Sequence, residues 1–280
     1  MIFNYIYWNP DPEIINIGGF SLRYYSVLFV SGIILCIYIL GWIFKRENIP
    51  SENLEKLSIY SVIGIIAGAR LGHCLFYEPS YFLSHPLEII LPVTFPPDGG
   101  MKFTGYQGLA SHGGVIGVLI AIYFYSRKTK HSMLDTLDLI SVAAGLLFAF
   151  IRIGNFMNSE IIGAPTTLPW GVVFERVDYV PRHPAQLYEA ISYLVIVAIM
   201  MTLYKRKRDL LKHGFFFGLG AVLFFTARFL IEFIKEDQVG FENGMALNMG
   251  QILSLPFILV GIGFIVYGLR KTENLAPEHS

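Results

Sequence analysis

Charge is scarce in this chain of 280 residues. Only 15% of its residues are charged, whereas soluble domains usually carry about 25%. Hydrophobic residues make up 54% of the sequence, and the mean hydropathy is +0.54. The formal net charge is zero, so no global field attracts nucleic acid and we expect no nucleic-acid partner. This composition predicts an integral membrane protein rather than a soluble domain.

Cysteine and cofactor motifs are scarce as well. The two cysteines, Cys36 and Cys74, lie in separate apolar runs, which excludes a disulfide framework and predicts two packing residues. The seven histidines form neither an HxxxH pair nor a cluster with cysteine, and no P-loop, dinucleotide fingerprint or GxSxG elbow is present. We therefore expect no metal and no other cofactor.

Long apolar runs dominate what remains. A membrane-spanning helix needs about 20 mostly apolar residues, and seven segments approach or exceed that length. They are 21–44, 57–77, 109–126, 134–151, 186–204, 214–234 and 250–269. We predict an all-α polytopic membrane protein with about seven transmembrane helices, forming a single membrane-embedded domain over residues 1–280. A small cap is expected around 164–183, where 170–174 resembles a short strand.

The basic residues predict the orientation of these helices. Thirteen of the 21 lysines and arginines lie in four short stretches between or after the predicted spans. They are Lys45, Arg46 and Lys56; Arg127, Lys128 and Lys130; Lys205, Arg206, Lys207, Arg208 and Lys212; and Arg270 and Lys271. Because basic loops stay in the cytoplasm, the N-terminus is expected outside and the C-terminus inside. The same stretches can contact anionic lipid headgroups.

Several of the other eight basic residues fall within spans or near their outer ends. An ionisable group inside the membrane costs about 2.5–3.5 kcal/mol on insertion scales and usually has a partner or a task. Four segments expected on the outer side share a polar, glycine-rich character: 68–73, 111–117, 152–163 and 182–189. Small residues there also suit plain helix packing, with Arg70 reaching to the interface. His112, at a glycine-rich helix start, can exchange protons near neutral pH.

The third of these segments suits phosphate binding. Helical spacing places Arg152, Asn155 and Ser159 on one face, and an arginine fork matches phosphate oxygens. Glu160 is expected to pair with an arginine and hold it in place. The alternative is a purely structural Arg–Glu pair.

Two further groups suit helix starts and interior ion pairs. Pro184 fits a first helical turn, so Gln186 and Glu189 would enter the membrane after it. Arg228 and Glu232 have the spacing of an ion pair on one helix face. With no other obvious anchor, that pair is expected to face the protein interior.

These segments together resemble a known family. The run RIGNFMNSEIIG at 152–163 is similar to the signature of the prolipoprotein diacylglyceryl transferases. Other landmarks of that family follow the same order: GARLG at 68–72, LFY at 75–77, HGG at 112–114, RHPAQLYE at 182–189, Arg228 with Glu232, and MGQ at 249–251. Ile151 and Ala69 stand where the family usually has glycine, and the lead-in over 104–111 is longer than usual. The resemblance covers nearly the whole chain.

The resemblance implies an enzyme of the bacterial cytoplasmic (inner) membrane, with its active site toward the non-cytoplasmic side. It would move the diacylglyceryl group of phosphatidylglycerol onto the lipobox cysteine of a prolipoprotein signal peptide. A thioether forms and glycerol phosphate leaves. The expected partners are therefore phosphatidylglycerol, prolipoprotein signal peptides and the surrounding membrane lipids.

The same resemblance assigns roles to residues. We expect Arg152 and Arg228 to stabilise the leaving phosphate, and His112 to act as base for the substrate thiol, although a nearby arginine could also lower the thiol pKa. Residues expected to bind phosphatidylglycerol are Arg152, Arg70, Tyr25, Asn155, Glu160 and Gly163. Supporting residues are Gly113, Gly114, Asn158, Arg182, His183, Gln186, Glu189 and Glu232. Tyr24 competes with Tyr25 for its role, and both also suit interfacial aromatics.

Two other classes of protein remain open from the residues alone. A transporter or channel would also place Arg, Glu and His within spans, although the repeated halves and interrupted helices common there are not evident. A non-catalytic scaffold would use Arg152 and Arg228 only as partners of glutamates.

Overall fold

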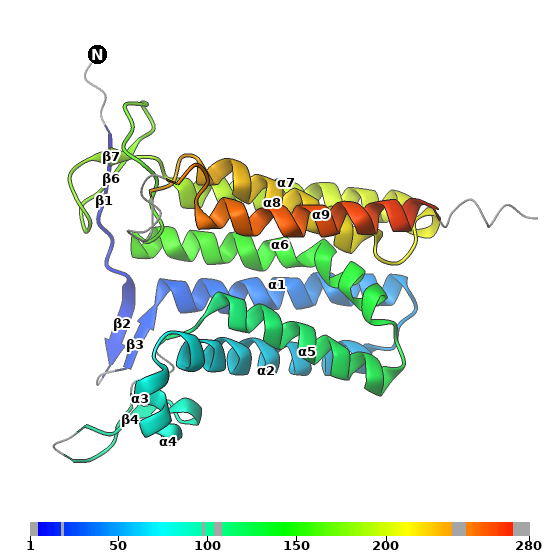
Figure 1. The fold of residues 1–280 in the computed structure, drawn as a ribbon, viewed down its shortest axis with the longest axis horizontal. Helices are drawn as coiled ribbons and strands as arrows, with labels where there is room; N and C mark the ends of the chain where they lie inside the picture. Colours follow the sequence, from blue (N-terminus) through cyan, green and yellow to red (C-terminus); the bar gives the residue numbers. More distant parts are fainter. Residues whose placement is uncertain (1–4, 18–19, 97–98, 104–107, 237–244, 271–280) are drawn as a thin grey trace, which may run out of the picture. The chain divides into compact units, whose positions relative to one another are not determined.

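The protein is mostly helical (Figure 1). The computed structural model describes residues 5–17, 20–96, 99–103, 108–236 and 245–270. The chain forms two compact units, one of residues up to 43 together with those from 137 onward, and one of residues 44–136. The first unit holds most of the predicted site.

Five long helices build the first unit: α1 (Tyr24–Arg46), α6 (Met133–Asn158), α7 (Ala185–Lys207), α8 (Phe215–Glu232) and α9 (Met249–Arg270). A 3₁₀ turn, η1 (Arg208–Leu210), extends α7. The last residues of α1 and the first of α6 fall in the second unit. Small residues let these helices pack closely. Gly32 of α1 lies against α6, and Gly145 of α6 lies against Val197 of α7 and Phe224 of α8. In Figure 1, α7, α8 and α9 run side by side, and the backbones of α8 and α9 meet at Gly218 and Gly261.

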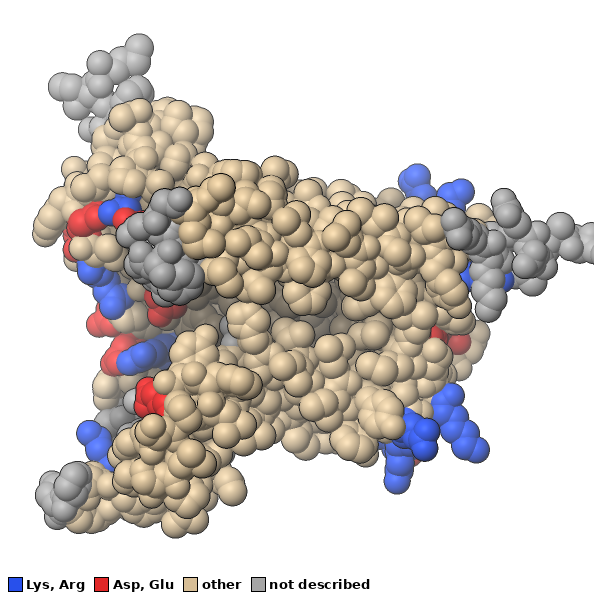
Figure 2. Space-filling model, in the orientation of Figure 1, with Lys and Arg blue, Asp and Glu red and all other residues tan. Residues whose placement is uncertain are grey.

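Six helices in the described part of the chain are long and apolar enough to cross a membrane. They are α1, α2 (Ser51–Phe76), α6, α7 with η1, α8 and α9. The third predicted segment, 109–126, also forms a helix, α5 (Ser111–Thr129), which is not among the six. On the face shown in Figure 2, the charged side chains gather toward the helix ends and the sides of the helices are almost free of them. The chain is thus a multi-pass membrane protein.

The fourth predicted segment is longer than expected. We predicted a helix over 134–151, whereas α6 continues to Asn158. The apolar run ends near residue 151, but the polar side chains that follow have partners in the folded chain, described below. Because those partners satisfy them, the helical backbone continues through the polar signature.

A small sheet forms the predicted cap. Strands β1 (Ile6–Trp8), β6 (Val172–Phe174) and β7 (Pro181–Arg182) lie in the order β1-β6-β7, with β1 parallel to β6 and β7 antiparallel to it. Its apolar core consists of Phe156, Ile162, Val172 and Phe174, with Trp8 and Leu187 packed against them. The predicted strand within 170–174 is therefore confirmed. A separate hairpin of β2 (Glu13–Ile17) and β3 (Phe20–Arg23) leads into α1.

The second unit is a tightly packed helix pair with a small appendage. Gly64, Gly68 and Gly72 of α2 face Gly113 and Gly117 of α5, and a Cβ at Gly64 would lie 2.5 Å from the carbonyl oxygen of Gly117. Small residues at this spacing let two helical backbones touch. Between the two helices the chain forms α3 (Pro79–Ser84), α4 (Pro86–Ile90), β4 (Val93–Thr94) and β5 (Lys102–Phe103).

Candidate active site

The signature segment ends α6 with a tight turn. Ser159 has a left-handed backbone (φ 57°), its N–H donates to the carbonyl of Phe156 (3.1 Å), and the N–H of Glu160 donates to that of Asn155 (2.9 Å). These two bonds form a Schellman motif, with Ser159 in the position that glycine usually occupies. We predicted that Ser159 shares a helical face with Arg152 and Asn155. That prediction is wrong, because the helix has already ended at Asn158.

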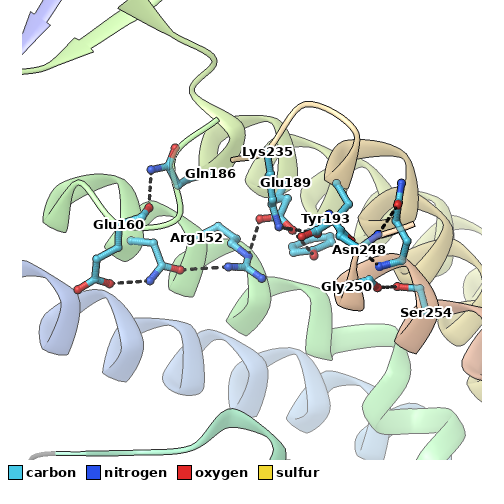
Figure 3. A network of polar contacts seen from close by, with 12 residues as sticks. Arg152, Glu160, Gln186, Glu189, Tyr193, Lys235, Asn248, Gly250 and Ser254 are labelled. Atoms are coloured by element: carbon cyan, nitrogen blue, oxygen red, sulfur yellow. Dashed lines mark hydrogen bonds and ion pairs between the residues drawn. The ribbon is translucent and has the colours of Figure 1, made fainter. Parts of the chain in front are cut away.

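Side-chain amides connect Arg152 to Glu160. Arg152 Nη1 donates to Asn155 Oδ1 (3.3 Å), and Asn155 Nδ2 donates to Glu160 Oε2 (3.0 Å). Asn158 Nδ2 donates to the other oxygen of Glu160 (3.1 Å). Figure 3 shows the run of contacts that joins Arg152 to Glu160 along the end of α6. Among the described residues, Glu160 forms no ion pair with an arginine; it holds Arg152 through Asn155.

The ion-pair partner of Arg152 is Glu189 of α7. Arg152 Nε lies 2.9 Å from Glu189 Oε2, and the Glu189 side chain is fully buried. Lys235, just past α8, donates to the other oxygen of Glu189 (3.1 Å). Tyr193, one turn along α7, donates to that same oxygen (3.4 Å). Since burying one unpaired carboxylate is costly, two cations hold Glu189 in place, one from α6 and one from the segment after α8.

The predicted pair of Arg228 with Glu232 is absent from the described residues. Glu232 Oε2 lies 3.0 Å from Lys235 Nζ instead. The half-buried Arg228 forms no hydrogen bond or ion pair with any residue that the structure describes. Its charge acts on the hydroxyl of Tyr193, as does that of Arg152. Tyr193 thus has guanidinium groups from α6 and α8 near it.

The start of α9 closes this charged cluster. Asn248 and Gln251 exchange side-chain bonds with each other's backbone N–H groups, at 3.0 and 3.1 Å, which is a capping box at a helix N-terminus. A Cβ at Gly250 would lie 2.6 Å from the Glu232 carboxyl carbon. Glu232 therefore lies directly against the first turn of α9, where the helix dipole favours a negative charge.

Tyr25 of α1 faces the signature helix. A Cβ at Gly154 would lie 2.7 Å from the Tyr25 ring, so this glycine allows the ring to contact the α6 backbone. Both Glu160 and Arg152 act electrostatically on the Tyr25 hydroxyl. The neighbouring Tyr24 is 38% exposed. Of the two tyrosines, Tyr25 is the one placed beside the predicted site residues.

Gly163 lies where three segments meet. Its N–H donates to the carbonyl of His183 (3.0 Å), and it bridges to Lys235. A Cβ here would lie 2.5 Å from the Cβ of His183 and 2.8 Å from the carbonyl oxygen of Ile234. The structure therefore explains this glycine by close backbone packing between the signature loop, the cap and the end of α8.

Other predicted residues of the cap stabilise the contact between the signature loop and the cap. Arg182 Nη1 donates to the Gly163 carbonyl (3.3 Å) and pairs with Glu236 (3.1 Å). Its hydrogen bonds also hold the pKa of Asp178 below its usual value. Gln186 donates to the carbonyl of Glu160.

His183 lies beside the start of α7 in the same cap. One ring nitrogen is 3.2 Å from the hydroxyl of Tyr188, which also accepts a hydrogen bond from Trp170 (2.9 Å). Burial lowers the pKa of His183. These contacts indicate that His183 anchors the cap to α7.

Four predicted site residues lie in the second unit. Arg70 donates to the carbonyls of Glu88 and Ile89 (2.5 and 3.3 Å). This arrangement fixes the α3–α4 segment. His112 is exposed at the second position of α5. Gly113 packs against the α2 backbone, whereas a Cβ at Gly114 would meet only Ala69 at an ordinary 3.6 Å and the carbonyl of Ile65 at 3.7 Å.

Two members of the charged cluster were not among the predicted site residues, namely Lys235 and Tyr193. The signal for Lys235 was a basic residue three positions after Glu232, near the end of an apolar run. Tyr193 carried no signal, because a tyrosine in a membrane helix is ordinary and only the fold brings it within reach of the charges of two arginines.

Comparison with known proteins agrees with the family resemblance of the sequence motifs. The family model for prolipoprotein diacylglyceryl transferase matches residues 12–267. The chain is 53% identical over 268 residues to the phosphatidylglycerol--prolipoprotein diacylglyceryl transferase of Bacteroides fragilis, covering 95% of this chain and 97% of that protein. Proteins of the same name from Tolumonas auensis and Chloroherpeton thalassium are 44% and 39% identical; the matches cover 95% and 96% of this chain and 98% and 97% of those proteins. This chain belongs to the prolipoprotein diacylglyceryl transferase family.

Proposed function

We propose that this enzyme transfers the diacylglyceryl group of phosphatidylglycerol to the lipobox cysteine thiol of prolipoproteins, the first step of lipoprotein maturation. The cysteine sulfur bonds to the glyceryl carbon, and the bond from that carbon to the phosphate oxygen breaks. Glycerol phosphate leaves with the electron pair, and the thiol proton goes to a base. The family match over residues 12–267 carries this proposal.

Arg152 and Arg228 are proposed to bind the phosphate that leaves. Negative charge grows on it as the bond breaks, and fixed cations in a poorly solvated site stabilise that charge. For Arg152, the supporting observation is that Glu189 and Asn155 hold its guanidinium in place. Its side chain is still 14% exposed and can therefore be reached by a ligand. Arg228 supports it because no described residue neutralises it. Tyr25, Asn155 and Glu160 would orient the lipid or Arg152.

His112 is proposed as the base for the incoming thiol. Thiolate is the reactive form of cysteine, and its free pKa is about 8.5. The exposed position of His112 at the start of α5 suits contact with a substrate that arrives from outside the protein. Gly113 and Gly114 are proposed to support this end of α5, and Arg70 is proposed to bind lipid from the same unit.

We also propose seven spans, with the N-terminus outside and the active site on the non-cytoplasmic side of the bacterial cytoplasmic membrane. Basic residues precede both α2 and α6. Both stretches lie on the cytoplasmic side only if α5 brings the chain back across the membrane. This argument supports α5 as the seventh span and a single membrane-embedded domain.

The direct test combines purified protein, phosphatidylglycerol and a lipobox peptide, followed by mass spectrometry. We expect the peptide to gain one diacylglyceryl unit. Arg152→Gln should lower kcat/KM by about 10²–10³-fold, and Arg152→Lys should not restore it, because lysine lacks the two-pronged fork. Arg176→Gln, at an exposed arginine of the cap, is the matched control. Unchanged transfer by Arg152→Gln would refute the phosphate-binding role.

A further inference from the structure

Lys235 is a buried lysine between two buried carboxylates. Its side chain is 2% exposed, and its Nζ lies 3.1 Å from Glu189 Oε1 and 3.0 Å from Glu232 Oε2. The backbone of Lys235 is also held, because its N–H donates to the carbonyl of Glu232 (3.2 Å) and it bridges to Gly163. The position of this ammonium group is therefore set by the signature loop and the end of α8.

The ion-paired groups around Lys235 are balanced in charge. Arg152 and Lys235 contribute two positive charges, and Glu189 and Glu232 contribute two negative charges. Each oxygen of Glu189 has its own cation, Arg152 on one side and Lys235 on the other (Figure 3). Because these groups are buried, water screens them little and a single missing charge changes the local field strongly.

Removing the ammonium would leave Glu189 with Arg152 as its remaining ion-pair partner and would take from Glu232 the partner that it has among the described residues. Both carboxylates would then compete for the N–H groups of Arg152, and the local field would become more negative. An anionic phosphate is repelled by such a field. The two partners of Lys235 are also the two acids whose charge acts on Arg152.

We infer that Lys235 is a positioning residue for the lipid donor: it neutralises Glu189 and Glu232, so that Arg152 remains available to the phosphate of phosphatidylglycerol. This inference rests on the proposed function and deepens it. It predicts effects of opposite sign for charge changes on the two sides of the cluster.

The experiment measures KM separately for phosphatidylglycerol and for the acceptor peptide, on protein shown to be monodisperse. Lys235→Met should raise KM for phosphatidylglycerol at least tenfold, about 1.4 kcal/mol, and leave KM for the peptide unchanged. Glu232→Gln removes one of the competing negative charges and should lower the lipid KM. The double variant removes one charge of each sign and should return to within about threefold of wild type.

Two controls separate positioning from folding. Lys56→Met removes an equal charge from an exposed Lys–Glu pair on α2 and should change neither KM. A purely structural Lys235 would lower the active fraction without splitting the two KM values. Lys235→Arg, which keeps the charge, should recover most of the lipid affinity.

Each outcome bears on the inference in a defined way. Folded Lys235→Met with an unchanged lipid KM overturns it, as does a double variant no better than Lys235→Met. Should Lys235→Met fail to fold, Glu232→Gln and the balanced double variant decide, and a raised lipid KM in either overturns it. Absence of transfer by the wild type would instead refute the proposed function.

Discussion

Three arginines of this protein differ in how their guanidinium groups are engaged. Arg182 bonds to Asp178, to Glu236 and to the carbonyl of Gly163, so its charge is matched within the cap. Arg152 is held by Glu189 and Asn155, and Arg228 has no ion-pair partner among the described residues. At the residue scale, we therefore expect substitution of Arg182 to affect stability first, and substitution of Arg152 or Arg228 to affect transfer first.

His112 carries the residue-scale prediction about pH. Glutamine keeps a polar side chain but accepts no proton at physiological pH, so His112→Gln should slow transfer near neutral pH by about 10²–10⁴-fold. Its remaining rate should rise about tenfold per pH unit below the thiol pKa, as solvent generates the thiolate. The measurement is the transfer rate against pH. His131→Gln, beyond the other end of α5, is the control, and an unchanged profile for His112→Gln would remove this residue from proton chemistry.

At the scale of elements, glycine decides how closely helices approach. Gly113 and Gly117 contact the backbone of α2 directly, and Gly218 and Gly261 do the same between α8 and α9. A backbone carbonyl cannot rotate away as a side chain can, so added bulk must separate the helices. Gly113 is therefore needed for steric reasons, because a side chain there would push α2 and α5 apart. Gly114 has room for a methyl group.

Alanine substitutions at these two neighbours should therefore differ. Gly113→Ala places a methyl group against the α2 backbone at Gly68 and Gly72 and should destabilise the protein by about 1–3 kcal/mol. Gly114→Ala meets only ordinary contacts and should leave stability nearly unchanged, since alanine also favours the helix. Thermal unfolding in detergent measures the difference. Equal loss in both variants would contradict the close α2–α5 packing.

At the scale of the whole molecule, the apolar helix surfaces and the basic loops determine insertion. Six helices qualify as spans among the described residues, and the proposed topology adds α5. An odd number of spans places the two termini on opposite sides of the membrane. The side on which each loop lies is therefore the property that tests the orientation.

Single cysteines in a background lacking Cys36 and Cys74 test this topology. We expect a membrane-impermeant maleimide to label Met101→Cys in intact cells, because that exposed residue precedes α5 on the proposed outer side. Lys130→Cys, directly after α5, should react only once the membrane is opened. Identical labelling of the two would show that α5 does not cross.

Part of the candidate site could be predicted from the sequence. Arg152, Asn155 and Glu160 were predicted to act together, and the structure joins them by hydrogen bonds. The expected pairing of Glu160 with an arginine was wrong. Arg152 pairs with Glu189 instead, which lies 37 positions later and is brought near only by the packing of α7 on α6. The partner of Glu232 was wrong for a similar reason, since the chain turns after α8 and carries Lys235 back.

The sequence by itself determined the class of protein, the helical segments, the strand of the cap and the family, because hydropathy and local motifs act over a few turns of chain. The tertiary structure alone decided which acid neutralises which base and which glycines are needed for contact. Those outcomes depend on distances between helices far apart in sequence, and a buried charge takes whichever partner the packing places within reach.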